Sequence, residues 1–257
     1  MTFNEKYTAF TTIFRKEIVR FTRIWVQSLL PPVVTMFLYF VIFGKFIGSQ
    51  ISDISGYSYM EFIVPGLVMM AVITNSYSNV VSSFFSTKFQ HSVEELLVSP
   101  TPNYVIILGY VCGGMTRGIL VGILVTITSL IFVPLKIHNV GFVVLYISLT
   151  AFLFSLAGLM NAIFAKKFDD ITIIPTFVLT PLIYLGGVFY SINLLPSFWQ
   201  EASKLNPILY MVNGFRFGFL GMTDVNVFFG LAISIVFIVI LFFAILYLLK
   251  KGVGLKE

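Results

Sequence analysis

The run VFFGLAISIVFIVILFFAILYLL, Val227 to Leu249, contains no charged residue and is long enough to cross a lipid bilayer. A helix needs about 20 apolar residues to cross the hydrocarbon core, whereas a strand seldom exceeds about 10 residues. The run also lacks the alternation of apolar and polar residues that a membrane barrel requires. It therefore predicts a transmembrane helix.

Five more runs of similar character precede it, and each is expected to cross the membrane. They are Ile24–Phe43, Phe62–Phe85, Val105–Val133, Gly141–Phe164 and Ile171–Tyr190. The mean hydropathy of +0.98 and the absence of a long polar block exclude a soluble domain. The sequence predicts an all-α integral membrane protein in which residues 1–257 form one domain, with spans one to five within 24–190 and span six at 227–249.

The positive charges predict the orientation. Eleven lysines and arginines lie on the side of the membrane that holds both termini, the 86–104 loop and the 165–170 loop, against four on the other side. Because positive residues favour the cytoplasmic side, both termini are expected to be cytoplasmic. This distribution follows the ends of the spans, so the net charge of +5 does not indicate nucleic-acid binding.

Residues 1–23 predict an amphipathic helix lying in the lipid headgroup layer. Apolar residues recur at helical spacing, and basic residues cluster to one side. The segment has neither the apolar core nor the cleavage site of a signal peptide. Glu17 falls at the edge of the apolar stripe, near Arg20. It is expected either to pair with a basic residue of a loop or partner, or to tilt into water or pair with a neighbour on its own helix.

The stretch FQHSVEELLVSPTP, Phe89 to Pro102, predicts a short cytoplasmic helix over 92–99. Ser92 and Glu95 have the spacing of a capping box, and Ser99 is biased out of helical geometry by Pro100. Val93, Leu96 and Leu97 share one face of this helix, and Glu94 points elsewhere. A two-turn helix is marginal alone, so it is expected to need a partner surface.

Small residues and prolines within the spans predict helix contacts and kinks. Gly109, Gly113, Gly114, Gly118 and Gly122 lie in the third span, and Gly158 and Ala162 in the fourth, at spacings that let helices approach closely. Kinks are expected at Pro31–Pro32 in the first span and at Pro175 and Pro181 in the fifth. Such kinks are either ordinary structural features or the walls of a pathway.

Residues 191–225 are too apolar for an ordinary exterior loop and predict a re-entrant hairpin of two short helices. Pro196 is expected at the first helical position of one helix. Asn206 is expected to cap the other, which starts at Pro207 and ends near Gly221.

A few polar residues stand within apolar segments. Arg117 lies near the middle of its span and is expected either to line a pathway or to bond between helices, with Glu61 as a partner only if it lies deeper than its position suggests. Asn75 is expected to form an interhelical hydrogen bond. Arg216 is expected either to extend to the exterior headgroups or to brace the hairpin. Asp169 and Asp170 are expected to be solvated, to cap the fifth span, or to contact a partner.

The order of these features resembles the membrane subunit of ABC-2-type exporters over essentially the whole chain. The stretches RIWVQSLLPPVVTMFLYF, FIVPGLVMMAVITN, FDDITIIPTFVLTPLIYLGGVFY and NPILYMVNGFRFGFLG look particularly like the YadH-like bacterial permeases. The resemblance implies that residues 92–98 are a coupling helix, held with Pro100 in a cleft of an ATP-binding subunit, and that the N-terminal helix flanks that contact.

The resemblance also implies the partners: a second copy of the permease, two ATP-binding cassette subunits and the bilayer of the bacterial inner membrane. The sequence has no G-x-x-x-x-G-K-[ST] phosphate loop, so ATP and Mg are expected on the partner subunit. No catalytic residue, cofactor or metal site is expected, because Cys112 is the single cysteine and the two histidines lack ligand spacing. Two rival functions are an ion-coupled secondary transporter and a membrane scaffold. The absence of a carboxylate inside a predicted span argues against the secondary transporter.

Overall fold

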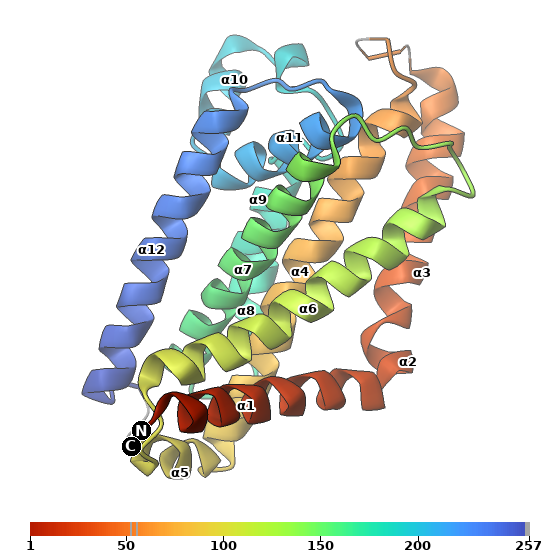
Figure 1. Ribbon diagram of the computed structural model, residues 1–257. Coiled ribbons are helices and arrows are strands. Elements are labelled where there is room, and N and C mark those ends of the chain that lie inside the picture. The colour runs from red at the N-terminus through yellow and green to blue at the C-terminus, as the bar shows by residue number, and fades with distance from the viewer. Residues whose placement is uncertain (52, 55, 255–257) are drawn as a thin grey trace.

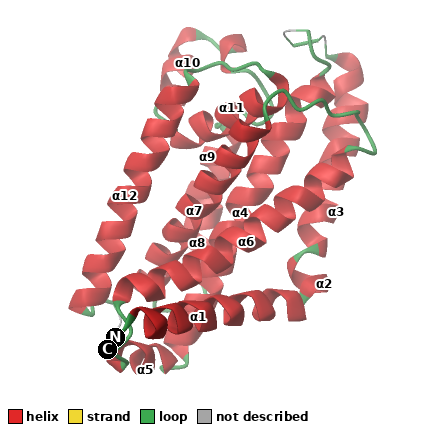
Figure 2. Cartoon of the chain, viewed as in Figure 1, coloured by secondary structure: helices red, strands yellow, loops and turns green. Residues whose placement is uncertain are grey.

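The computed structural model describes residues 1–51, 53–54 and 56–254. In this part of the chain the regular structure is helical, with one isolated β-bridge between Ile54 and Tyr57 and no strand (Figure 1, Figure 2). The prediction of an all-α protein is confirmed.

Five of the described helices are long and apolar enough to cross a membrane. They are Trp25–Ile47, which comprises α2 (Trp25–Ser28), α3 (Leu30–Tyr39) and the π-helix η1 (Phe40–Ile47), together with α4 (Tyr59–Phe89), α6 (Asn103–Ser129), α7 (Val140–Phe164) and α12 (Val227–Lys251). The fifth predicted run, Ile171–Tyr190, is a shorter apolar helix over Asp170–Tyr184. It ends early because the chain turns after Tyr184, where Gly187 adopts a φ of 71° that favours glycine.

Helix α4 lies at the centre of the bundle. In its most apolar window 83% of the residues are buried inside the protein, against 11% for α12, which lies at one edge (Figure 1). Helices α6, α7 and α11 (Pro207–Leu220) all pack against α4. A movement of α4 therefore reaches most of the bundle.

Glycines set the distance between α4 and its neighbours. A Cβ added at Gly118 of α6 would lie 1.8 Å from the Ser76 hydroxyl oxygen, and one added at Gly158 of α7 would lie 2.5 Å from the Tyr77 carbonyl oxygen. These glycines let the backbones approach closely where lipid supplies no hydrophobic drive for helix association. The predicted helix contacts are confirmed.

The prolines interrupt the helices that carry them. Helix α2 ends at Ser28, and α3 carries Pro31 and Pro32 in its first turn. In the fifth run, α8 (Asp170–Ile174) gives way to the π-helix η3 (Pro175–Leu179), and Pro181 lies in the first turn of α9 (Thr180–Tyr184). Where the sequence predicts kinks, the structure shows changes of helix type or breaks between helices, whereas the π-helix over Phe40–Ile47 has no signal in the sequence.

Two sets of short elements cover opposite ends of the bundle. Helix α1 (Phe3–Arg23) crosses one end together with α5 (Ser92–Val98) and the last turn of α12 (Figure 1). The 3-10 turn η4 (Ile192–Leu194), α10 (Ser197–Lys204) and α11 lie at the other end, where the first span also ends in the short 3-10 turn η2 (Gly48–Gln50). The two sets of short elements are therefore separated by the length of the long helices.

Candidate functional site

The short helix α5 is attached directly to the central helix α4. Gln90 ends α4, and His91 adopts a left-handed conformation with φ 58° before α5 begins at Ser92. The predicted capping box is wrong: because the chain turns at His91, Ser92 is already helical and makes no side-chain cap bond. The predicted C-terminal end of this helix lies within one residue of the observed end, since α5 stops at Val98 and Ser99 is extended before Pro100.

The apolar face of α5 packs against the protein's own core. Val93 is only 1% exposed, and Leu96 and Leu97 are half-buried against the core beside it. The expectation that these three residues present a free face to a partner is therefore corrected. The exposed side carries Glu94 and Glu95, and Val98 is 87% exposed.

The end of α4 that carries α5 is fixed to the neighbouring loop. Phe85, Phe89 and Phe168 form a cluster of ring contacts with centroids 4.9 to 6.1 Å apart. Lys88 Nζ donates to the carbonyl oxygens of Ile163 and Ala165, at 2.8 and 2.6 Å, where α7 ends. The end of α4 that carries α5 is therefore attached to the end of α7.

Helix α1 places a carboxylate inside the protein. Glu17 is fully buried; Ser83 Oγ donates to its Oε1 over 2.6 Å, and Arg20 Nη2 donates to its Oε2 over 3.2 Å. Of the alternatives, the structure shows pairing on the same helix: within the described part of the chain, the basic side chains that lie within 4.0 Å of the Glu17 carboxylate are Lys16 and Arg20, both of α1. The hydrogen bond between Glu17 of α1 and Ser83 of α4 was not predicted, because the sequence carries no signal for it.

Arg117 and Asn75 meet in the middle of the bundle. Arg117 Nη2 donates to the Ser28 carbonyl oxygen over 2.9 Å and to Asn75 Oδ1 over 3.3 Å. The interhelical hydrogen bond of Asn75 is confirmed, and it joins α4 to α6. Glu61 is not the partner of Arg117, because its carboxylate accepts from the amide and hydroxyl of Ser58 in the capping box of α4.

Arg216 lies inside the protein at the opposite end, where it is fully buried. Its Nη2 donates to the Gly187 carbonyl oxygen over 2.6 Å, and its guanidinium lies over the ring of Phe62. Extension to the exterior headgroups is therefore wrong, since no atom of Arg216 reaches the surface. The residue instead joins α11 to the turn at Gly187 and to Phe62 of α4.

The helix starts in this region follow the sequence closely. Asn206 Oδ1 accepts from the Ile208 amide over 3.0 Å, and Pro207 is the first residue of α11. Gly221 ends α11 with φ 73°. The expected cap and stop are confirmed, whereas Pro196 precedes α10 as its N-cap and is not its first helical residue.

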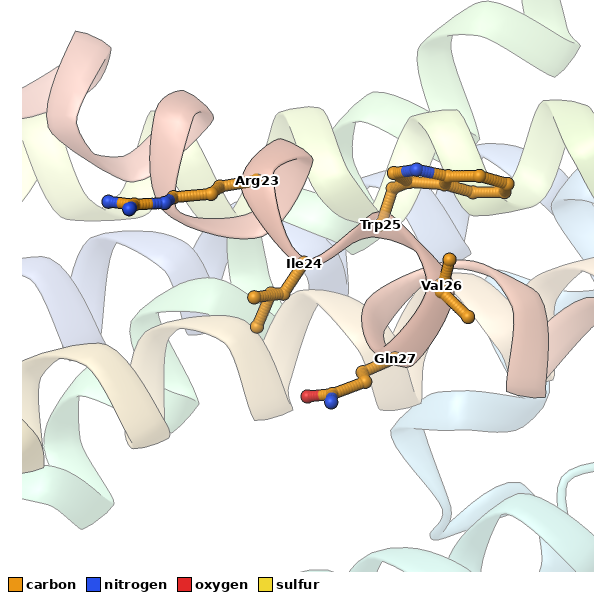
Figure 3. Close-up of a pocket in the computed structure, with 5 residues that line it drawn as sticks. All are labelled: Arg23, Ile24, Trp25, Val26 and Gln27. Atoms are coloured by element: carbon orange, nitrogen blue, oxygen red, sulfur yellow. The ribbon is translucent and has the colours of Figure 1, made fainter.

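A groove lies at the elbow between α1 and α2. It is lined by Arg23, Ile24, Trp25, Val26 and Gln27 (Figure 3). All five residues are exposed. In Figure 3 the Arg23 and Trp25 side chains extend to opposite sides of the elbow. A cation and an indole ring at the start of a span are typical of anchors at a membrane surface.

The family model of the ABC-2 type transporter matches residues 8–220. The chain belongs to this family. It is 60% identical, over 251 residues and 98% of each chain, to the inner membrane transport permease YadH of Escherichia coli strain K12. It is also 22% identical to nodulation protein J of Rhizobium leguminosarum bv. trifolii, over 93% of this chain and 92% of that protein.

These similarities confirm the resemblance drawn from the sequence, including its YadH-like character. The protein is a transport permease of the ABC-2 family with several membrane-crossing helices.

Proposed function

We propose that the protein is the membrane subunit of an ATP-driven exporter of the inner membrane, and that two copies pair with two ATP-binding cassette subunits. ATP and Mg are bound by those partners, whose closure moves α5 and α1. The spans of the two copies then tilt and open a shared path toward the hairpin end. Membership of the ABC-2 family and the name of the Escherichia coli relative support this proposal.

One observation carries the coupling role. The exposed side of α5, made of Glu94, Glu95 and Val98, projects from the end of the bundle, and the buried side of the same helix is anchored to α4. A protein that grips the exposed side would therefore act on the most buried helix of the bundle. Helix α1 crosses the same end and enlarges the contact surface (Figure 1).

The orientation follows from charge. The end that holds α1 and α5 also carries Lys166 and Lys167, and α12 finishes there with Lys250 and Lys251. Positive residues at one end favour the cytoplasmic side, where ATP is available. With α1 and the last turn of α12 at the same end, the proposed spans are even in number, and Asp170–Tyr184 with the turn that follows it would supply the sixth crossing.

A paired substitution tests the coupling role. Val98 and Leu205 are both 87% exposed, but they lie at opposite ends of the bundle. The permease is purified from native membranes with the ATPase that accompanies it, and ATP hydrolysis is measured in lipid nanodiscs. Val98→Asp is expected to abolish association or lower the hydrolysis rate, and Leu205→Asp is expected to leave both unchanged. Equal behaviour of the two variants would refute the assignment of α5.

A further inference from the structure

Four polar side chains spaced four residues apart form a stripe along α4. They are Asn75, Asn79, Ser83 and Thr87, here called the α4 ladder. Residues four apart on a helix lie nearly above one another, so the stripe runs along one side of α4. Each member contacts a charged side chain from another helix.

Three members of the ladder bind α1. Ser83 Oγ donates to Glu17 Oε1 over 2.6 Å. Arg20 Nη2 donates to both the side-chain and the backbone oxygen of Asn79, at 2.8 and 2.9 Å. Lys16 Nζ donates to Thr87 Oγ1 over 3.4 Å. The fourth member, Asn75, accepts from Arg117 of α6.

Two glycines of α6 allow α1 to pack closely against the bundle. A Cβ at Gly109 would lie 2.6 Å from the Ile13 side chain, and a Cβ at Gly113 would lie 2.4 Å from Glu17 Cβ. Helix α1 therefore lies directly on the backbone of α6 while it bonds to α4. This depth of contact exceeds what an amphipathic helix lying in the headgroups alone requires.

The buried charges make it unfavourable for α1 to separate from α4 and α6. Among the described ladder members and their partners, Glu17 is the one carboxylate, and it is fully buried between Ser83 and Arg20. A buried carboxylate that loses one of its partners keeps the cost of burial without the compensating bond. Helix α1 is therefore held in one position relative to α4 and α6.

We infer that the α4 ladder, with Glu17 and Arg20, is a latch that locks the interfacial helix α1 to the transmembrane helices α4 and α6. The part of this inference that concerns coupling rests on the proposed function. Glu17 and Arg20 are positioning residues: they touch no substrate, but they make α1 and α4 move as one body. A displacement of α1 by an ATPase would then reach Arg117 through the ladder.

Hydrogen–deuterium exchange on the full-length permease in nanodiscs tests the latch without any ATPase. Glu17→Gln keeps the shape and removes the charge, and Ser83→Ala removes the donor with little change in volume. Both are expected to raise amide exchange in α1 by roughly tenfold, because hydrogen bonds to charged groups are strong. Ser82→Ala is the matched control: among the described residues, Ser82 Oγ donates to the carbonyl oxygens of Ser78 and Asn79 in its own helix and to no atom of α1, and the Asn79 oxygen keeps its bond from Arg20 in this variant.

The pattern of exchange separates a latch from a general structural role. A latch predicts faster exchange confined to α1, with α7 and α11 unchanged. Unchanged α1 exchange in both variants, or faster exchange throughout the bundle, would overturn the latch.

A second measurement uses the permease with its co-purified ATPase, and follows exchange in α6 with and without ATP plus vanadate. The nucleotide-dependent change in α6 is expected in wild type and Ser82→Ala, and is expected to be lost in Glu17→Gln. If the change persists in Glu17→Gln although α1 exchange has risen, transmission through the ladder is refuted. If no ATPase accompanies even the wild type, the proposed function fails, while the first measurement still decides the latch.

Discussion

The guanidinium carbon of Arg216 lies 3.9 Å from the centroid of the Phe62 ring. This contact joins α11 to the first turns of α4. Arg216 Nη2 also donates to the Gly187 carbonyl oxygen in the turn after α9. One side chain therefore connects three segments that are far apart in the sequence.

Replacement of Arg216 by alanine is expected to destabilise the protein by about 2 to 4 kcal/mol, because it removes the cation–π contact and the Gly187 bond and leaves a cavity. Thermal unfolding in detergent measures the effect. Lys204→Ala is the control, since Lys204 is half-exposed and its ion pair with exposed Glu201 contributes within about 1 kcal/mol. A wild-type unfolding midpoint in Arg216→Ala would contradict the bracing role.

Replacement of Gly158 by alanine is expected to cost about 1 to 3 kcal/mol. The new Cβ would lie 2.5 Å from the backbone oxygen of Tyr77, which can move only with α4 itself. Gly141→Ala in the same helix is the control, because its Cβ would meet the Asn139 side chain at 3.2 Å at the helix start. Thermal unfolding of the two variants should differ clearly, and equal midpoints would show that α4 and α7 are not in close contact.

The Asp170 carboxylate is expected to make a pH-dependent contribution to stability. The backbone N–H groups of Lys166 and Lys167 donate to its Oδ2 and hold the pKa of this carboxyl below its usual value. A lowered pKa stabilises the folded state above the usual value, and this stabilisation is lost as the pH falls through the lowered value.

Asp170→Asn should therefore unfold at a lower temperature than wild type near pH 7, and the difference should shrink below about pH 4. Asp169→Asn is the neighbouring control, and it is expected to resemble wild type throughout. A difference between wild type and Asp170→Asn that stays constant down to acidic pH would show that the carboxylate is not held by these amides.

The features that could be predicted from the sequence are those that local chemistry determines. Apolar runs longer than 20 residues gave the long helices, Asn206 and Gly221 gave the start and end of α11, and Pro31 and Pro175 gave interruptions. Each of these depends on residues within one or two turns of the feature.

The features that could not be predicted depend on neighbours in space. The helical spacing of Val93, Leu96 and Leu97 predicts that they share one face of α5. The spacing does not indicate that this face packs against the protein's own core. Arg216 and Glu17 could be singled out in the sequence, yet Gly187, which accepts from Arg216, and Ser83, which donates to Glu17, lie 29 and 66 residues away from them. A periodic pattern gives the direction of a side chain on its helix, and it does not give the helix that lies opposite.

The central claim is that an ATPase binds the exposed side of α5. The most direct measurement places a photo-reactive amino acid at Val98, and separately at Leu205, in the full-length permease in native membranes, and identifies the cross-linked proteins by mass spectrometry. Val98 is expected to give a cross-link to a protein with an ATP-binding cassette, and Leu205 is expected to give none. A cross-link to such a protein from Leu205, with none from Val98, would contradict this claim.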